Sequence, residues 1–137
     1  MISTRGRYAL RVMVDLAENG GEERLLSLRE ISERLGISRK YLESIMNTLV
    51  KADLVVSHPG KTGGYRLSRS PRDLTAEEIL APAEGTICPV SCVDEGCEEA
   101  CPERVDCPTL PLWEGLDTTI RSYLSSVRLS DLIRLQK

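Results

Sequence analysis

A short glycine turn between two amphipathic stretches is the feature that most restricts how this chain can fold. The first stretch begins with the capping box Ser27-Leu-Arg-Glu30 and ends at Leu35, with apolar side chains at helical spacing. The second follows Ser38, a good N-cap residue, and continues to about Ala52. Between them, Gly36 can adopt a positive φ without steric cost. Two helices joined so tightly form a helix-turn-helix.

A β-hairpin is predicted immediately after the second of these helices. Residues 54–57 and 65–68 read as strands, and the glycine-rich segment 58–64 supplies the turn. A hairpin in this position makes a winged helix. The chain has no Phe and only one Trp, so its core must consist mostly of aliphatic side chains, which favours packed helices. The predicted fold is therefore mainly α, with a small β-hairpin wing.

A long helix is predicted after Pro111, near the C-terminus. Its apolar residues follow one stripe, formed by Leu112, Leu116, Ile120, Tyr123, Leu124 and Val127. This stripe exceeds what a small winged helix can cover, so it predicts a homodimer with a two-fold interface. Packing of the stripe onto its own domain is the alternative.

Three regions are expected along the 137 residues. A winged helix-turn-helix domain occupies 1–72, and its first helix covers residues 3–19. A linker helix and a cysteine-rich loop occupy 73–108. The capping box Thr75-Ala-Glu-Glu78 announces this helix, which is expected to stop near Pro82. A dimerisation helix and a short final helix occupy 109–137.

The charges of the chain are distributed unevenly. Residues 1–72 carry 13 Lys and Arg against 8 Asp and Glu, whereas residues 73–137 carry 5 against 13. A basic first part with an acidic remainder indicates a nucleic-acid reader joined to a separate sensing or assembly region. No apolar run is long enough for a membrane span, and the N-terminus lacks the plan of a signal peptide, so a cytoplasmic location without membrane contact is expected.

Exposed positions of the second helix and the wing are the candidate DNA contacts. In a helix-turn-helix, the second helix enters the major groove. Lys61 in the wing can meet a phosphate, while Gly63 and Gly64 would let the backbone approach DNA closely. The complete predicted set is Ser38, Arg39, Lys40, Glu43, Ser44, Asn47, Lys61, Gly63 and Gly64. The only histidine, His58, lies in the wing, and no nucleophile motif is present, so an enzyme is not expected.

All five cysteines fall between Cys88 and Cys107, with the spacing C-x3-C-x4-C-x3-C-x5-C. An odd number of thiols in a cytosolic chain argues against structural disulfides. Iron–sulfur ligation and thiol redox switching without metal both remain open. Tetrahedral zinc is a less favoured alternative, for which the ligands would be Cys88, Cys92, Cys97 and Cys101.

Four separated motifs resemble the IscR/NsrR/CymR family of bacterial winged-helix regulators, over nearly the whole chain. They are Ile2-Ser-Thr-Arg-Gly-Arg-Tyr-Ala-Leu-Arg11, Ile31-Ser-Glu-Arg-Leu-Gly-Ile-Ser-Arg-Lys-Tyr-Leu-Glu43, Gly63-Gly-Tyr-Arg-Leu67 and Leu112-Trp-Glu-Gly-Leu116. The resemblance implies a homodimer that binds a pseudo-palindromic operator in double-stranded DNA, with Glu43 reading bases. It also implies that some branches sense through a [2Fe–2S] or related cluster, and that the branch devoted to cysteine metabolism lacks the cluster cysteines.

Cys92, Cys101 and Cys107 fall where the cluster-binding relatives place their ligands. The fourth ligand departs from the family pattern, because Leu110 and Arg7 stand where relatives have a histidine or an aspartate. Cys97 or Cys88 is the expected substitute. The resulting interpretation is a dimeric repressor, or dual regulator, controlled by an iron–sulfur cluster. The alternative is a cluster-free regulator of cysteine or sulfur metabolism that senses through thiol redox chemistry or a partner enzyme.

Overall fold

The computed structural model describes residues 2–90 and 107–135. Its helices and strands, in chain order, are α1 (Thr4–Asn19), α2 (Leu28–Leu35), α3 (Arg39–Lys51), β1 (Val55–His58), β2 (Gly64–Leu67), the 3₁₀ turn η1 (Pro71–Asp73), α4 (Ala76–Glu84), α5 (Leu110–Ser126) and α6 (Leu129–Leu135). The mainly helical fold with a two-stranded wing is the one that the sequence predicts. The predicted boundaries of 1–72, 73–108 and 109–137 stay expectations.

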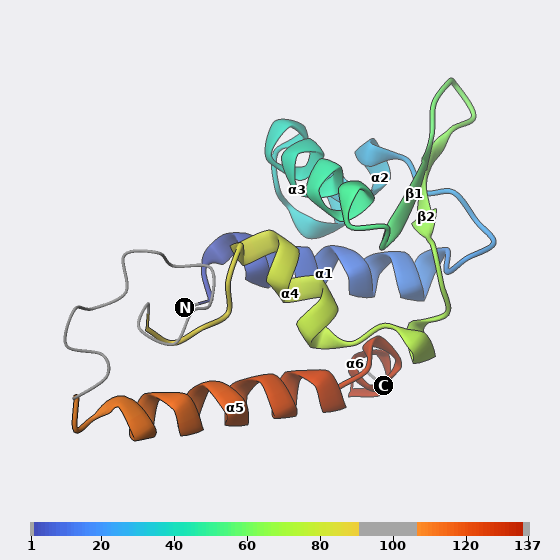
Figure 1. Ribbon diagram of the computed structural model, residues 1–137. Coiled ribbons are helices and arrows are strands. Elements are labelled where there is room, and N and C mark those ends of the chain that lie inside the picture. The colour runs from blue at the N-terminus through green and yellow to red at the C-terminus, as the bar shows by residue number, and fades with distance from the viewer. Residues whose placement is uncertain (1, 91–106, 136–137) are drawn as a thin grey trace.

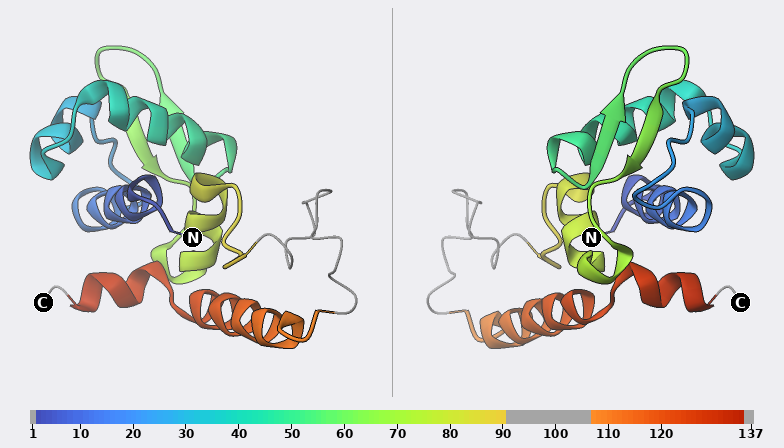
Figure 2. Two further views of the ribbon diagram at one scale, coloured as in Figure 1. Left: turned by 90° about the vertical axis from the view of Figure 1, so that its left-hand side faces the viewer. Right: turned by 90° about the vertical axis from the view of Figure 1, so that its right-hand side faces the viewer.

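The elements lie in three levels. Helices α1 and α4 pack against each other in the middle (Figure 1). The pair α2 and α3 and the β-hairpin lie on one side of them, and α5 and α6 lie on the other (Figure 2). The predicted recognition helix and wing are therefore on the side of the molecule that faces away from the long C-terminal helix.

The helix-turn-helix forms as its local sequence dictates. The Ser27 hydroxyl accepts from the Glu30 amide at 3.1 Å, and the Glu30 carboxylate accepts from the Ser27 amide at 3.3 Å. Gly36 ends α2 with φ of +68°, and the Ser38 hydroxyl accepts from the Tyr41 amide at 3.1 Å. The capping box, the left-handed glycine and the second cap are thus confirmed.

One aliphatic core holds α1, α2 and α3 together with the wing. Its fully buried side chains include Met13 and Leu16 of α1, Ile31 of α2, and Leu67 of β2. Helix α3 contributes Leu42, Ile45, Met46 and Leu49, which recur at intervals of three and four. This spacing directs one face of α3 inward and leaves the other face to solvent.

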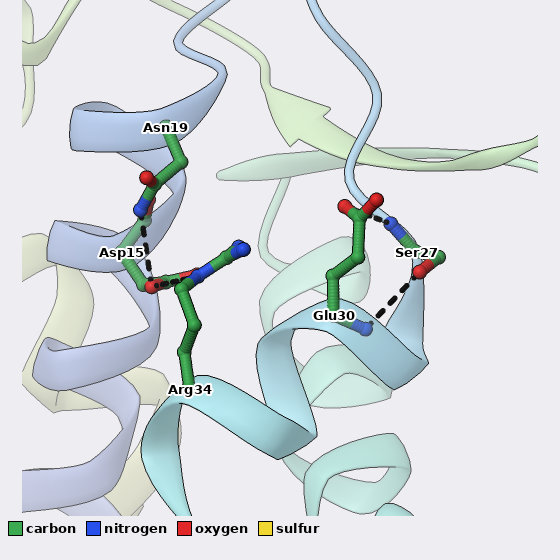
Figure 3. A network of polar contacts seen from close by, with 5 residues as sticks. All are labelled: Asp15, Asn19, Ser27, Glu30 and Arg34. Carbon is green, nitrogen blue, oxygen red and sulfur yellow. Dashed lines mark hydrogen bonds and ion pairs between the residues drawn. The ribbon is translucent and has the colours of Figure 1, made fainter.

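An ion pair ties α1 to α2 beside the core. The Arg34 guanidinium donates two hydrogen bonds to the Asp15 carboxylate, at 2.8 and 2.9 Å, and the Asn19 amide adds a third at 3.2 Å (Figure 3). The Asp15 side chain is 8% exposed and that of Arg34 is 36% exposed. The hydrogen bond to Asp15 raises the pKa of Arg34, against the opposing effect of burial. A nearly buried carboxylate is therefore neutralised by a bidentate partner.

The wing is an antiparallel pair in which Val55 lies opposite Leu67 and His58 lies opposite Gly64. The loop before α2 adds to it, because Leu26 and Tyr65 exchange backbone hydrogen bonds of 2.9 and 2.8 Å. The predicted strands are each displaced by one residue. The wing is consequently attached to the helix-turn-helix through its second strand.

Helix α4 differs from its predicted form in two ways. It was expected to stop near Pro82, but it continues through this residue to Glu84. The Thr75 hydroxyl does cap the Glu78 amide at 3.2 Å. The Glu78 carboxylate, however, accepts from Arg69 at 3.1 Å and forms an ion pair there, so the reciprocal half of the predicted capping box is replaced by a contact with the end of the wing.

Helix α5 divides the predicted apolar stripe between two faces. Ile120, Leu124 and Val127 are half-buried, and α5 packs against α4. Leu112, Leu116 and Tyr123 are exposed by 63%, 39% and 66%. Part of the stripe thus packs onto its own chain, which was the alternative, and the remainder faces solvent.

Paired backbone hydrogen bonds join the end of α5 to the start of α4. The Ala76 amide donates to Val127, and the Leu129 amide donates to Leu74, at 2.9 and 2.8 Å. The Arg128 guanidinium also donates to the Arg72 carbonyl at 2.5 Å. This junction connects the C-terminal helices to the segment that immediately follows the wing.

Candidate nucleic-acid interface and cysteine segment

The outward face of α3 carries the residues predicted to contact DNA. The exposed residues of this face include Arg39, Lys40, Glu43, Ser44 and Asn47. Opposite them lies the buried stripe described above, so the hydrophobic core fixes which side of the helix is presented. Lys51 extends the same face by one turn.

Ser38 and Ser44 are both exposed, yet their hydroxyls already have partners in the protein. Ser38 caps α3. The Ser44 hydroxyl accepts a 3.0 Å hydrogen bond from the Arg5 guanidinium of α1. A serine hydroxyl has two acceptor lone pairs and one donor, so a further contact is chemically available to each.

The wing exposes Lys61 and His58 at its tip, and Gly63 and Gly64 are half-buried. A Cβ at Gly63 would lie 1.9 Å from the His58 carbonyl oxygen, and a Cβ at Gly64 would lie 2.5 Å from the Leu26 carbonyl oxygen. Gly64 also has φ of +156°. Close backbone packing inside the protein therefore requires both glycines, independently of any approach to DNA.

Arg5 lies beside the candidate interface, and the sequence patterns did not single it out. Its guanidinium donates to the Ser44 hydroxyl and the Ser44 carbonyl, both at 3.0 Å, and to the Thr48 hydroxyl at 2.7 Å. Arg5 borders a shallow depression together with Lys40, Glu43, Asn47 and Lys51. Periodicity cannot reveal this contact, because it joins residues about 40 positions apart.

Two of the five cysteines lie within the described residues. Cys88 is 4% exposed, and Arg121 of α5 donates to its sulfur at 3.1 Å. Cys107 is half-buried, with its sulfur 3.0 Å from the Thr109 hydroxyl oxygen. The predicted ligands Cys92 and Cys101, and the candidate Cys97, lie outside the described residues. Across 2–90 and 107–135, no group of three potential ligands comes together.

Arg121 connects Cys88 to the acidic side chain of Asp117. The Arg121 guanidinium forms an i,i+4 ion pair with Asp117 at 3.1 Å and also reaches the Cys88 sulfur. These two hydrogen bonds, first that to Cys88, raise the pKa of Arg121. The start of the cysteine-rich segment is thus held against α5.

A winged helix that presents polar and cationic side chains on its second motif helix has the architecture of a DNA-binding transcriptional regulator. Residues 2–135 match the model of one family. The chain belongs to the Rrf2 family, which is described as iron-dependent transcriptional regulators. This membership confirms the predicted resemblance, and it identifies a class of regulators rather than of enzymes.

Named relatives cover most of the chain. The protein rrf2 of Nitratidesulfovibrio vulgaris is 33% identical over 133 residues, which are 97% of this chain and 87% of the relative. The HTH-type transcriptional regulator IscR of Cereibacter sphaeroides is 37% identical over 135 residues, which are 97% of this chain and 86% of the relative.

Solved structures from two branches share the fold. The structure of CymR, the global cysteine regulator of B. subtilis, superimposes with a TM-score of 0.76 at 35% identity and covers 98% of this chain and 97% of that one. T. potens IscR has a TM-score of 0.73 at 31% identity and covers 100% of this chain and 88% of that one. The overall fold alone therefore does not separate the IscR branch from the CymR branch.

Among the described helices, none has the length and apolarity to cross a membrane.

Proposed function

We propose that this chain is a homodimeric repressor, or dual regulator, that binds a pseudo-palindromic operator and whose operator affinity is controlled by an iron–sulfur cluster. The observation that carries the proposal is the exposed polar face of α3 beside an exposed wing, in an Rrf2-family chain with five clustered cysteines. The proposal includes a cytoplasmic location.

DNA reading is assigned to α3 and backbone contact to the wing. Glu43 can accept from a cytosine amino group, whereas Arg39 and Lys40 can meet guanine or phosphate. Lys61 at the exposed wing tip suits a phosphate. Ser38, Ser44 and Asn47 complete the α3 surface, and Gly63 and Gly64 shape the wing. In a dimer, two such surfaces would enter successive major grooves about 34–36 Å apart.

Glu43→Ala and Lys61→Ala separate base reading from backbone contact. Glu43→Ala is expected to relax base preference at one operator position, because it removes an acceptor on the exposed face of α3. Lys61→Ala is expected to weaken binding to all duplexes and to lower the salt slope by about 1. Fluorescence anisotropy on operator and random duplexes at several salt concentrations measures both effects. Equal losses on the two duplexes for Glu43→Ala would exclude its role in base reading.

The cofactor proposal depends on the donor set of the cysteine-rich segment. Thiolates are the usual ligands of iron–sulfur clusters, and a [2Fe–2S] centre takes four ligands. Cys92, Cys101 and Cys107 would hold it, with a fourth ligand from Cys97 or Cys88. When bound, the cluster would supply a redox-active centre. Zinc remains the less favoured candidate, and its ligands would be Cys88, Cys92, Cys97 and Cys101.

The surroundings of Cys88 favour Cys97 as the fourth ligand. The Cys88 sulfur is nearly enclosed by protein and accepts a hydrogen bond from Arg121. A cluster at this sulfur would have to share that enclosed space with the guanidinium. Cys88→Ser is therefore expected to retain the cluster, whereas Cys97→Ser is expected to lose it.

Anaerobic purification with quantification of iron, sulfide and zinc tests the cofactor. The proposal expects iron and sulfide in equal amounts, with visible absorbance, and a change in operator affinity of about tenfold when the cluster is removed, equivalent to about 1.4 kcal/mol of coupling. Operator affinity that is identical with the cluster intact, oxidised and removed would contradict control by the cluster.

A cluster-free regulator of cysteine or sulfur metabolism is the second candidate. The similarity to the cysteine regulator CymR of B. subtilis favours it. On this alternative, anaerobic protein lacks iron and colour but still binds the operator. Thiol oxidation or a partner enzyme then alters its affinity.

A further inference from the structure

The first turn of α1 is anchored independently of α3. The Glu84 carboxylate accepts from the Ser3 amide at 2.7 Å and from the Ser3 hydroxyl at 2.9 Å. A carboxylate at a helix N-terminus is favourable because it opposes the positive end of the helix dipole. Gly6 allows this approach, since a Cβ there would lie 2.1 Å from the Glu84 Oε1 atom. The position of Arg5, which lies between these two anchors, is therefore well defined.

Two contacts join the N-terminal part of α1 to α3. Arg5 donates three hydrogen bonds to Ser44 and Thr48, and one of them goes to the Ser44 carbonyl rather than to a side chain. One turn earlier on α3, the ring of Tyr41 packs edge-on against Tyr8 of α1, with centroids 6.0 Å apart. Positions 41, 44 and 48 follow one face of α3 at helical spacing. We call this α1–α3 contact the seam.

The seam lies directly beside the face of α3 that is proposed to read DNA. Glu43 and Asn47 each immediately precede a seam residue in the chain, so they project about 100° away from it around the helix axis. A rotation of α3 by about 20° would displace a side-chain tip at a radius of roughly 5–6 Å by about 2 Å, which is enough to break a hydrogen bond to a base. The rotation of α3 therefore matters for reading.

No carboxylate of the described residues neutralises the positive charge of Arg5. Within residues 2–90 and 107–135, Arg5 forms no ion pair with a carboxylate. All three of its described acceptors are neutral oxygens. Hydrogen bonds to α3 alone would not require a positive charge on the same surface as Lys40 and Lys51. Beside DNA phosphates, however, a positive charge is attracted electrostatically.

We propose that Arg5 is a positioning residue of the DNA interface, which fixes the rotation of α3 through Ser44 and Thr48 and thereby aims Glu43 and Asn47 at the bases. This inference rests on the proposed function. It assigns a role in sequence discrimination to a residue of α1, outside the helix-turn-helix and the wing. Arg5 acts through its neighbours, so its removal should affect the choice among sequences more than the affinity for DNA in general.

Arg5→Lys tests the proposal because it keeps the charge and removes the forked hydrogen bonds. The operator is the duplex that the wild-type full chain selects from a randomised pool. We expect Arg5→Lys to bind this duplex about tenfold more weakly, with affinity for random duplex within twofold of wild type and an unchanged salt slope. Thr48→Val removes one acceptor and no charge. It should lower the ratio of operator affinity to random-duplex affinity about threefold.

Arg29→Lys is the matched control, because Arg29 pairs with Glu33 on α2 and forms no hydrogen bond or ion pair with α3 among the described residues. It should leave the ratio unchanged. Thermal unfolding of each variant checks folding, and if Arg5→Lys does not fold, Thr48→Val decides alone. An unchanged ratio in folded Arg5→Lys and Thr48→Val overturns the inference while leaving the proposed function intact. A wild-type chain that selects no sequence overturns both.

Discussion

At the scale of single residues, a few buried polar contacts and close approaches carry much of the specificity of the fold. Asp15 is the only buried charged residue of the described chain, and Arg34 neutralises it from another helix. Breaking a buried pair by removing one partner leaves a charge without compensation, which is costly. The exposed pair of Arg29 and Glu33 offers the opposite case.

Arg34→Met is expected to lower the free energy of unfolding by about 2 kcal/mol, less than for a fully buried pair because the arginine is partly exposed. Arg29→Met should change it by less than about 0.5 kcal/mol. Urea unfolding followed by circular dichroism measures both. Because the pKa of Arg34 is raised in the folded protein, its contribution to the free energy of unfolding is present in full below the ordinary arginine pKa. It is therefore the same at pH 7 and at pH 9. Equal effects of the two substitutions would show that the bidentate contact contributes nothing.

Gly64→Ala should destabilise the wing strongly. Its φ of +156° and the 2.5 Å approach of a Cβ to the Leu26 carbonyl oxygen require the backbone to move. The loss is expected to be about 3 kcal/mol or more. Gly21→Ala is the control, because Gly21 also has a positive φ, +62°, but open space around it, so it should lose only about 1 kcal/mol. Similar losses of unfolding free energy at both positions would indicate that the positive φ alone is responsible, and that the close approach to Leu26 contributes nothing.

At the scale of elements, local chemistry explains what the sequence could predict. The ends of α2 and α3 were predictable because Ser27, Glu30, Gly36 and Ser38 act on their own neighbours. The continuation of α4 through Pro82 was not predictable from local sequence, because proline disfavours a helix interior and the packing of α4 against α1, α3 and α5 is a tertiary feature. The contact of Arg5 with α3 was missed for the same reason, because it depends on tertiary structure.

Ser27→Ala is expected to lower the free energy of unfolding by about 1 kcal/mol, because it leaves the Glu30 amide of α2 without its cap. Differential scanning calorimetry should show a shift of a few degrees. Ser125→Ala serves as the comparison, since this exposed hydroxyl bonds only within α5. A wild-type melting temperature for Ser27→Ala would mean that water replaces the cap at no cost.

At the scale of the whole molecule, α5 leaves an apolar face that its own chain does not cover. Leu112, Leu116 and Tyr123 are three of the four large apolar residues exposed in the described chain. They recur at spacings of four and seven, so they share one face of the helix. An exposed apolar face on a helix that packs on its other side is the proposed two-fold interface.

Leu116→Glu combined with Tyr123→Glu should convert the proposed dimer to a monomer, because two carboxylates would be buried without partners at the interface. Sedimentation equilibrium of the wild-type and variant chains measures the change. Operator affinity should fall by at least 100-fold, while circular dichroism stays the same. Thr118→Glu, at an exposed position on a different side of α5, is the control. A wild-type chain that sediments as a monomer would contradict the proposal directly.

The junction between α4 and the end of α5 has a mechanical consequence. Leu74, Ala76, Val127 and Leu129 bind the two segments through main-chain atoms, which no side-chain substitution removes. In the proposed dimer, each winged helix-turn-helix would therefore be rigidly connected to its own α5, with little rotation between them at this junction. A small change in the angle at which the two α5 helices cross would then change the distance between the two α3 helices. The spacing of half-sites that an operator tolerates would therefore report this crossing angle.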